Sequence, residues 1–224
     1  RAGGHPLFIE EVLKGLLAAR AVTVADRKVV SVRLVGQDLA LPKTLRGLVA
    51  SRVAQLEDEE RATLYAAAVV GDPVDVEVLG RMTKKPLPEL ERSVHALSAR
   101  DFLVHTGPTE LRFRSPIVRE VVVDALPAVS SRELHAAAGA ALESHYGESS
   151  IEHAGRIATH LYEAGDRERA VVYWESAARC SGDAVDIARV LFNRGLVLSQ
   201  MGRSADAVVV YDELIARFGA ALDP

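Results

Sequence analysis

The residues of this chain that could do chemistry are few, and their spacing does not assemble a catalytic site. The sequence has no G-x-x-x-x-G-K-[ST] loop for a nucleotide phosphate and no H-E-x-x-H zinc motif. His153 and His160 are two helical turns apart and could share one face. A zinc site needs more ligands than these two, so we expect two surface histidines. Cys180 is the only cysteine, which excludes an internal disulfide and a multi-cysteine zinc site.

The remaining candidates have structural explanations. Ser130-Ser-Arg-Glu133 fits a capping box at the start of a helix, which accounts for both serines without nucleophilic catalysis. Trp174 falls where a helical repeat needs a packing residue. We therefore predict that this chain is not an enzyme, does not hydrolyse ATP and carries no metal or cofactor of its own.

Composition limits the classes of partner. The hydrophobic fraction of 49% supports real cores, and 224 residues suit two or three modules. The net charge of −4 gives no global basic field for nucleic acid. The longest apolar run, Leu64–Val70, is far shorter than the ~20 residues of a membrane span. A single cysteine suits a reducing cytoplasm. Because the chain begins at Arg1 rather than Met, we expect it to be a piece of a longer protein.

The first segment, residues 1–38, combines a helix with a hairpin. Apolar residues recur at helical spacing after Pro6, which suits a first helical turn. Residues 22–34 then alternate around a polar centre, which predicts a small β-hairpin.

Residues 39–127 have the pattern of a winged helix. Helical stripes run from Leu41, from Asp58 to Val70, from Val76 to Met82 and from Leu87 to Leu97. Two strands then flank a Thr-Gly-Pro-Thr turn, with Leu111 and Phe113 facing inward. Ser115-Pro116 is expected to cap a following helix through Leu126. This architecture does not by itself imply DNA binding.

Residues 128–224 contain a segment that recurs at an offset of 37 residues. Gly165 aligns with Gly202, Ala170 with Ala207, and an aromatic residue follows each alanine by four positions. Glycine in the turn with a small and then an aromatic residue is typical of tetratricopeptide-type helix pairs. A generic helical bundle is the alternative. The expected helices are listed by range: about 130–146, 151–163, 167–180, 185–201 and 204–218. The fold class is therefore mainly α: a winged-helix module with small hairpins, followed by a tetratricopeptide-like helical array.

The repeat frame predicts two surfaces on this array. Solenoids of this kind bind proteins or peptides on a concave side lined by the first helix of each pair. The groove-facing residues are predicted to be Glu152, Thr159, Tyr162, Arg189, Phe192 and Leu196. The last helix is apolar nearly all the way round, so we also expect self-association through it and continuation of the array beyond residue 224.

Nucleic acid is not the expected partner of the winged helix. Residues 41–127 carry 12 Lys and Arg against 13 Asp and Glu, a net charge of −1. The helix before the hairpin contains Glu89 and Glu91, whereas DNA affinity depends on neutralised phosphates. The basic set Arg81, Lys84, Lys85, Arg112 and Arg114 keeps a DNA-binding alternative open.

Four motifs in a fixed order resemble one family. They are Gly3–Glu11, Leu41–Val53, Phe113–Glu120 and His160–Asp166. In this order they are similar to the bacterial signal-transduction ATPases with numerous domains that occur beside cyclases, serine/threonine kinases and LuxR-type regulators. The resemblance implies that this chain follows the nucleotide-binding core and contains the end of the helical lid, the winged helix and part of a superhelical sensor.

The same resemblance implies roles for three residues. Gly4-His5-Pro6 matches the lid motif that touches the adenine, so Gly4 and Pro6 are implied nucleotide contacts. Ser115 stands where the family often has a phosphate-sensing histidine, and its place before Pro116 favours a helix cap instead. The parent protein would bind ATP or ADP with Mg²⁺ and relay the nucleotide state to partner binding. The alternative is a transcription regulator with a DNA-binding winged helix and a tetratricopeptide sensor.

Overall fold

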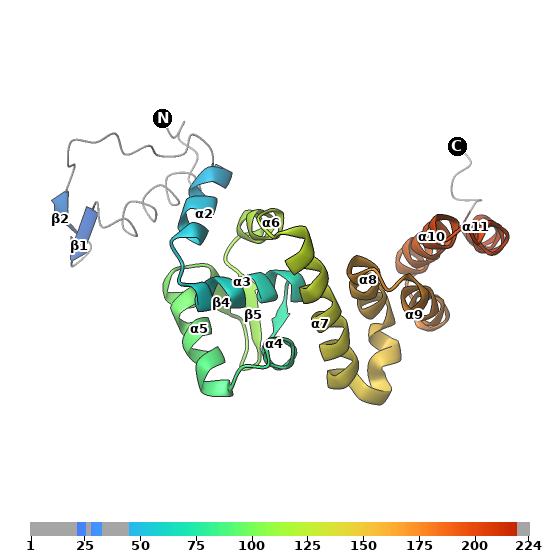
Figure 1. Cartoon of the computed structure of the whole chain (residues 1–224), viewed down its shortest axis with the longest axis horizontal. Coiled ribbons are helices and arrows are strands. Elements are labelled where there is room, and N and C mark those ends of the chain that lie inside the picture. Colours follow the sequence, from blue (N-terminus) through green and yellow to red (C-terminus); the bar gives the residue numbers. More distant parts are fainter. Residues whose placement is uncertain (1–21, 26–27, 33–44, 219–224) are drawn as a thin grey trace. The chain divides into compact units, whose positions relative to one another are not determined.

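The computed structural model describes residues 22–25, 28–32 and 45–218, which are mainly helical with two small sheets (Figure 1). Strands β1 (Val22–Ala25) and β2 (Lys28–Val32) form the predicted antiparallel hairpin, in which Val22 lies opposite Val32. The second sheet contains the antiparallel strands β4 (Leu103–His105) and β5 (Glu110–Phe113). The helix expected after Pro6 lies outside the described residues, as do Gly4 and Pro6. Among the described helices, none is long and apolar enough to cross a membrane.

The described residues fall into two compact units. One contains the chain up to Ala68 together with Pro88–Leu126, and the other contains Val69–Leu87 together with the chain from Pro127 onward. The segment Val69–Leu87 was assigned by sequence to the 39–127 module, but it clusters with the helices of the array. Packing of α4 (Val76–Thr83) against α7 (Ala128–Tyr146) within the second unit accounts for this difference.

The first unit builds its core from helices and one hairpin. Its elements are α2 (Leu45–Ala54), α3 (Asp58–Val70, which enters the second unit at its last two residues), α5 (Leu87–Ala99), β4 (Leu103–His105), β5 (Glu110–Phe113) and α6 (Pro116–Asp124). Three acidic residues open α3, where they favour the helix dipole. Leu64 of α3, Leu97 of α5 and Leu111 of β5 are fully buried.

The hairpin of this unit alternates as the sequence predicts. Leu111 and Phe113 are buried, whereas Arg112 between them is exposed. Leu103 lies opposite Phe113 in the antiparallel register. One face of the hairpin therefore packs on the core while the other remains open to solvent.

The second unit begins with β3 (Val74–Asp75) and α4 (Val76–Thr83). The Asp75 carboxylate caps α4 by accepting hydrogen bonds from the backbone N–H groups of Glu77 and Val78. The helix ends at Lys84, whose φ of 53° lies in the left-handed region. Val78 and Leu79 of α4 are fully buried, and α4 packs against α7.

The remaining elements of the second unit form a consecutive helical array. They are α7 (Ala128–Tyr146), the 3₁₀ helix η1 (Gly147–His153), α8 (Ala154–Ala164), α9 (Arg167–Cys180), α10 (Ala184–Gln200) and α11 (Ser204–Phe218). Each α-helix of the array packs against its neighbours in the chain. Gly165 and Gly202 adopt φ of 92° and 77° in the turns of the two helix pairs, which explains why glycine recurs there.

Two predicted helix starts in the array are wrong. The capping box at Ser130 does not begin α7, because Pro127 occupies the cap position and its carbonyl already accepts a hydrogen bond from the Ser131 N–H at 2.8 Å. Ala128 and Val129 therefore form the first turn. Residues 151–153 belong to η1, so α8 starts at Ala154 rather than at 151.

Candidate functional site

Of the six residues predicted to line a binding groove, five lie on the first helix of a pair and Glu152 lies just before one. Glu152 is in η1, Thr159 and Tyr162 are in α8, and the others are in α10. We call this set the first-helix face: Glu152, Thr159, Tyr162, Arg189, Phe192 and Leu196. Tyr162 is half-buried, and the other five are exposed.

Tyr162 joins the two halves of the first-helix face. Its hydroxyl donates a hydrogen bond to Oε1 of Gln200 on α10, at 3.3 Å. Gln200 continues the row of Phe192 and Leu196, because residues four apart lie above one another on a helix. The Tyr162 ring centroid is 5.7 Å from that of the buried Trp174, which fixes the ring against the core. The residues of α8 and α10 therefore belong to one surface.

Phe192 is the most prominent apolar group of this face. Its side chain is 52% exposed, and its ring centroid is 6.4 Å from that of Tyr211 on α11. The close approach of α10 and α11 at this point depends on Gly195, where an added Cβ would lie 2.6 Å from the Tyr211 ring. Leu196 extends the apolar surface by one turn.

The polar residues of the first-helix face differ in whether their side chains are available to bind a partner. The Thr159 hydroxyl donates to the Gly155 carbonyl of its own helix at 2.9 Å, so its proton is not available to a partner. Arg189 forms an exposed ion pair with Asp186 at 2.8 Å. Such a pair contributes little to stability, so a partner carboxylate can replace Asp186 at small cost.

The structure places His153 and His160 in different surroundings. His160 is buried, and its Nδ1 lies 3.1 Å from Nδ1 of His135 on α7, so the prediction of a surface histidine at 160 is wrong. His153 instead stacks on Tyr146 with ring centroids 3.5 Å apart. Partial burial, reinforced by Arg156, lowers the pKa of His153. Within the described residues, no group of three or more His, Cys, Asp or Glu could hold a metal ion.

Ser115 is the one implied nucleotide contact that lies within the described residues. It occupies the N-cap position of α6, in extended conformation before Pro116. Its hydroxyl makes no capping hydrogen bond, so its structural role comes from backbone conformation alone. This part of the expected capping is therefore wrong. The backbone carbonyl of Ser115 accepts the Val118 N–H at 3.0 Å, and Pro116 at the first helical position has no N–H that needs a partner.

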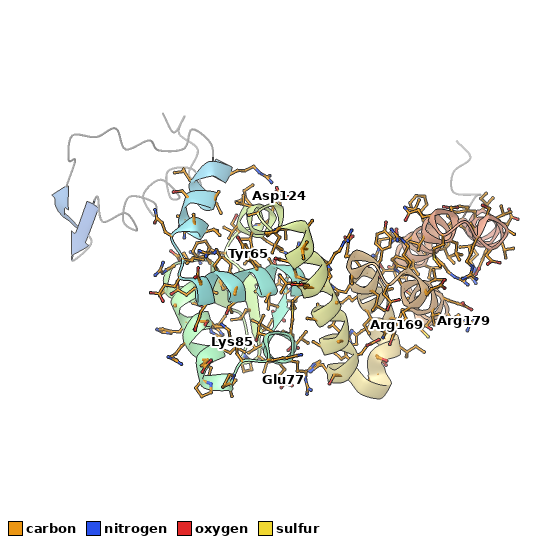
Figure 2. All side chains as sticks on the ribbon, in the orientation of Figure 1. Tyr65, Glu77, Lys85, Asp124, Arg169 and Arg179 are labelled. Carbon is orange, nitrogen blue, oxygen red and sulfur yellow. The ribbon has the colours of Figure 1, made fainter. Side chains whose placement is uncertain are left out.

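A second polar cluster was not predicted from the sequence. The Glu143 carboxylate of α7 accepts hydrogen bonds from the Tyr173 hydroxyl at 2.6 Å and from the Arg169 guanidinium. Burial, followed by the bond to Glu143, raises the pKa of Tyr173, and the same carboxylate raises the pKa of Arg169. Figure 2 shows Arg169 projecting from α9 in this region. These residues lie far apart in the sequence, so no spacing pattern indicates the cluster.

Comparison with known proteins identifies only the beginning of the chain. Residues 1–30 match a family model described as "Domain of unknown function (DUF8739)". No curated protein and no solved structure matches the chain.

Proposed function

We propose that this chain is a non-catalytic regulatory part of a multidomain bacterial signalling ATPase, which binds a protein segment on the first-helix face of a tetratricopeptide-like array. The proposal combines the family resemblance of the motifs with the arrangement of the two helix pairs. ATP or ADP with Mg²⁺ would bind to the core of the parent protein. Partner binding to the array would bias the same conformational equilibrium as the nucleotide does.

The exposed row of Phe192 and Leu196 is the observation that carries this proposal. Apolar side chains that remain exposed beside charged and hydrogen-bonding groups are typical of protein-binding surfaces. Phe192 and Leu196 provide apolar contact area, and Arg189, one turn earlier, supplies a cation. The Tyr162–Gln200 hydrogen bond extends this surface onto α8. A partner segment with apolar anchors beside an acidic residue matches this combination.

The winged-helix assignment rests on the helices α2, α3, α4 and α5, which precede the β4–β5 hairpin in the chain. This order agrees with that architecture, and the hairpin buries the two residues expected to face the core. On α5, which would enter a DNA groove, Glu91 is exposed beside Arg92. Phosphate binding needs a surplus of cations, so a role in protein signalling is favoured over DNA binding.

Selection from a displayed library of random 15-residue peptides would test the first-helix face. We expect enriched peptides to share apolar anchors and an acidic residue. Their affinity should fall by about tenfold or more in the Phe192→Ala, Arg189→Glu double variant, because buried aromatic anchors and paired charges dominate such interfaces. Fluorescence anisotropy with the labelled peptides measures the change.

Val172→Ala provides the matched control. Val172 is an exposed valine on α9 of the same array, outside the first-helix face, so its replacement should leave peptide affinity unchanged. Selected peptides that bind the double variant as tightly as the parent chain would show that the first-helix face is not the binding surface. Failure to select any peptide above background would count against the proposed function itself.

A further inference from the structure

The 37-residue offset aligns two helices whose surroundings differ. In the sequence alignment, the residues of α9 (Arg167–Cys180) correspond one by one to residues 204–217 of α11. Equivalent positions on the two helices should therefore face equivalent neighbours. On α9, one of those neighbours is α10, and among the described residues α11 has no helix in the corresponding place.

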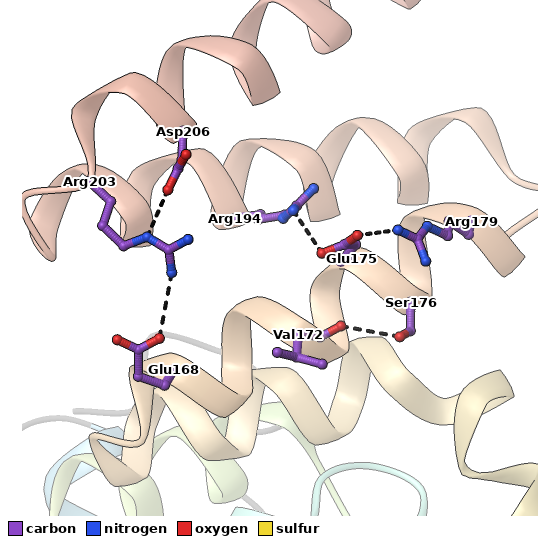
Figure 3. A network of polar contacts seen from close by, with 8 residues as sticks. All are labelled: Glu168, Val172, Glu175, Ser176, Arg179, Arg194, Arg203 and Asp206. Carbon is purple, nitrogen blue, oxygen red and sulfur yellow. Dashed lines mark hydrogen bonds and ion pairs between the residues drawn. The ribbon is translucent and has the colours of Figure 1, made fainter.

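The side of α9 that faces α10 contains a carboxylate between two apolar residues. The Glu175 carboxylate forms an ion pair with the Arg194 guanidinium of α10 at 2.8 Å (Figure 3). Ala178, one turn later, lines the same small cavity as Leu191 and Arg194. Val171, one turn earlier, is buried.

The equivalent residues of α11 are uncovered. We call Val208, Asp212 and Ile215 the α11 outer face. Val208 is 56% exposed where its equivalent Val171 is 5% exposed, and Ile215 is 63% exposed where Ala178 is 8% exposed. Asp212, the equivalent of Glu175, is exposed and forms no ion pair within the part of the chain that the structure describes.

A neighbouring position shows that this difference is specific to the α10 side. Val209 is 67% exposed, and its equivalent Val172 is 61% exposed although α10 is present. Exposure at this position is therefore the same in both pairs. By contrast, Val208 and Ile215 lie on the side that α10 covers in the first pair, and both are far more exposed than their equivalents.

We propose that the α11 outer face binds an amphipathic helix of a protein partner, with an arginine that pairs with Asp212 as Arg194 pairs with Glu175. Flanking aliphatic residues, equivalent to Leu191, cover Val208 and Ile215. A symmetric contact between two copies would instead bring two Asp212 carboxylates into one apolar surface without a cation, which is costly. Charge complementarity therefore favours the arginine-bearing helix over the self-association expected from apolarity alone.

A peptide with the sequence of α10 is the appropriate probe, because α10 already carries this pattern. The labelled peptide of residues 184–200 is titrated with the whole chain, and binding is followed by anisotropy. We expect saturable binding that weakens about tenfold in Val208→Glu, because a charge then enters the apolar contact. Val209→Glu is the matched control and should bind like the parent chain. Both residues are exposed, so the variants should keep the fold, which circular dichroism verifies.

A charge exchange tests the arginine–aspartate pair. Asp212→Arg should weaken binding of the parent peptide by roughly fivefold or more. A peptide with Glu at the position of Arg194 should bind the parent chain equally poorly but recover with the Asp212→Arg chain. Three results would overturn the proposal: no peptide binding, equal weakening by Val208→Glu and Val209→Glu, or a peptide-free dimer in sedimentation that Val208→Glu dissociates.

Discussion

The two helix pairs of the array pack their helices together with different side chains. In the pair α8–α9, Ala158 of the first helix and Trp174 of the second are both buried. In the pair α10–α11, these positions hold Gly195 and Tyr211, and the Tyr211 ring is half-buried. The ring lies so close to α10 that an added Cβ at 195 would be 2.6 Å from it. The first pair is therefore packed around a buried aromatic ring. The second pair instead needs glycine at position 195, because a side chain there would collide with the Tyr211 ring.

The pairs also begin differently. The repeat frame aligns η1 (Gly147–His153) with the first residues of α10, from Ala184 to Val190. Gly147, with a φ of 50°, interrupts α7 at the start of η1, whereas the Asp183 carboxylate caps a continuous α10. The aligned residues therefore form a 3₁₀ link between two helices in the first pair and part of a regular α-helix in the second. Equivalence in sequence specifies the packing core of each pair more strongly than its ends.

Removal of the two rings should have the largest and most unequal effect. Trp174→Ala should lower the free energy of unfolding by about 3–5 kcal/mol, because it leaves a cavity in a buried site. Tyr211→Ala should cost roughly 1–2 kcal/mol, because its side chain is only partly buried. Urea unfolding followed by circular dichroism measures both. Equal losses would mean that the two pairs do not differ in this way.

The clash at position 195 gives the next largest effect. Gly195→Ala should destabilise the chain by about 1 kcal/mol, because overpacking against Tyr211 outweighs the gain in helix propensity. In a Tyr211→Ala background the same change should stabilise by roughly 0.5–1 kcal/mol, since only the propensity gain remains. A double-mutant cycle in urea detects the sign reversal. The same sign in both backgrounds would show that the ring does not require glycine at 195.

Much of this fold could be predicted from local sequence signals. The predicted ranges 58–70, 167–180 and 204–218 coincide with α3, α9 and α11, because each is set by a turn residue and an apolar period. The alternation in the β4–β5 hairpin was equally local. The repeat frame also placed five of the six residues of the first-helix face on exposed positions.

The failures share a physical cause, which is competition from tertiary contacts or from an adjacent signal. The predicted start of α7 was wrong because Pro127 provides an earlier helix boundary than the capping box. His160 is buried because His135, which is 25 residues away, provides a polar partner in the core. The Tyr162–Gln200 bond depends in the same way on how α8 and α10 pack. Sequence periodicity indicates a face but not the partner across it.

The ion pair between α9 and α10 should give an effect no larger than that of Gly195→Ala. Arg194→Met should reduce the free energy of unfolding by about 1 kcal/mol, because this guanidinium is largely buried beside Glu175. Arg179 pairs with the same carboxylate but is mostly exposed, so Arg179→Met should cost a few tenths of a kcal/mol. Thermal unfolding of the two variants under one condition ranks them. A larger loss for Arg179→Met would indicate that burial does not govern the strength of these pairs.

The smallest expected effect concerns the junction before α8 and depends on pH. Burial and Arg156 lower the pKa of His153 in the folded chain below its ordinary value of 6.5. The unfolded chain therefore binds a proton more readily, and the stability contributed by neutral His153 is lost as the pH falls below about 6.5. The residue aligned with it in the second pair, Val190, does not titrate. His153→Gln should therefore make the fall in unfolding free energy between pH 7 and pH 5 shallower. The other six histidines are present in both proteins, so the difference between the two pH profiles isolates His153. A steeper profile in the variant would mean that His153 is stabilised in its charged form, with Glu152 outweighing burial at this junction.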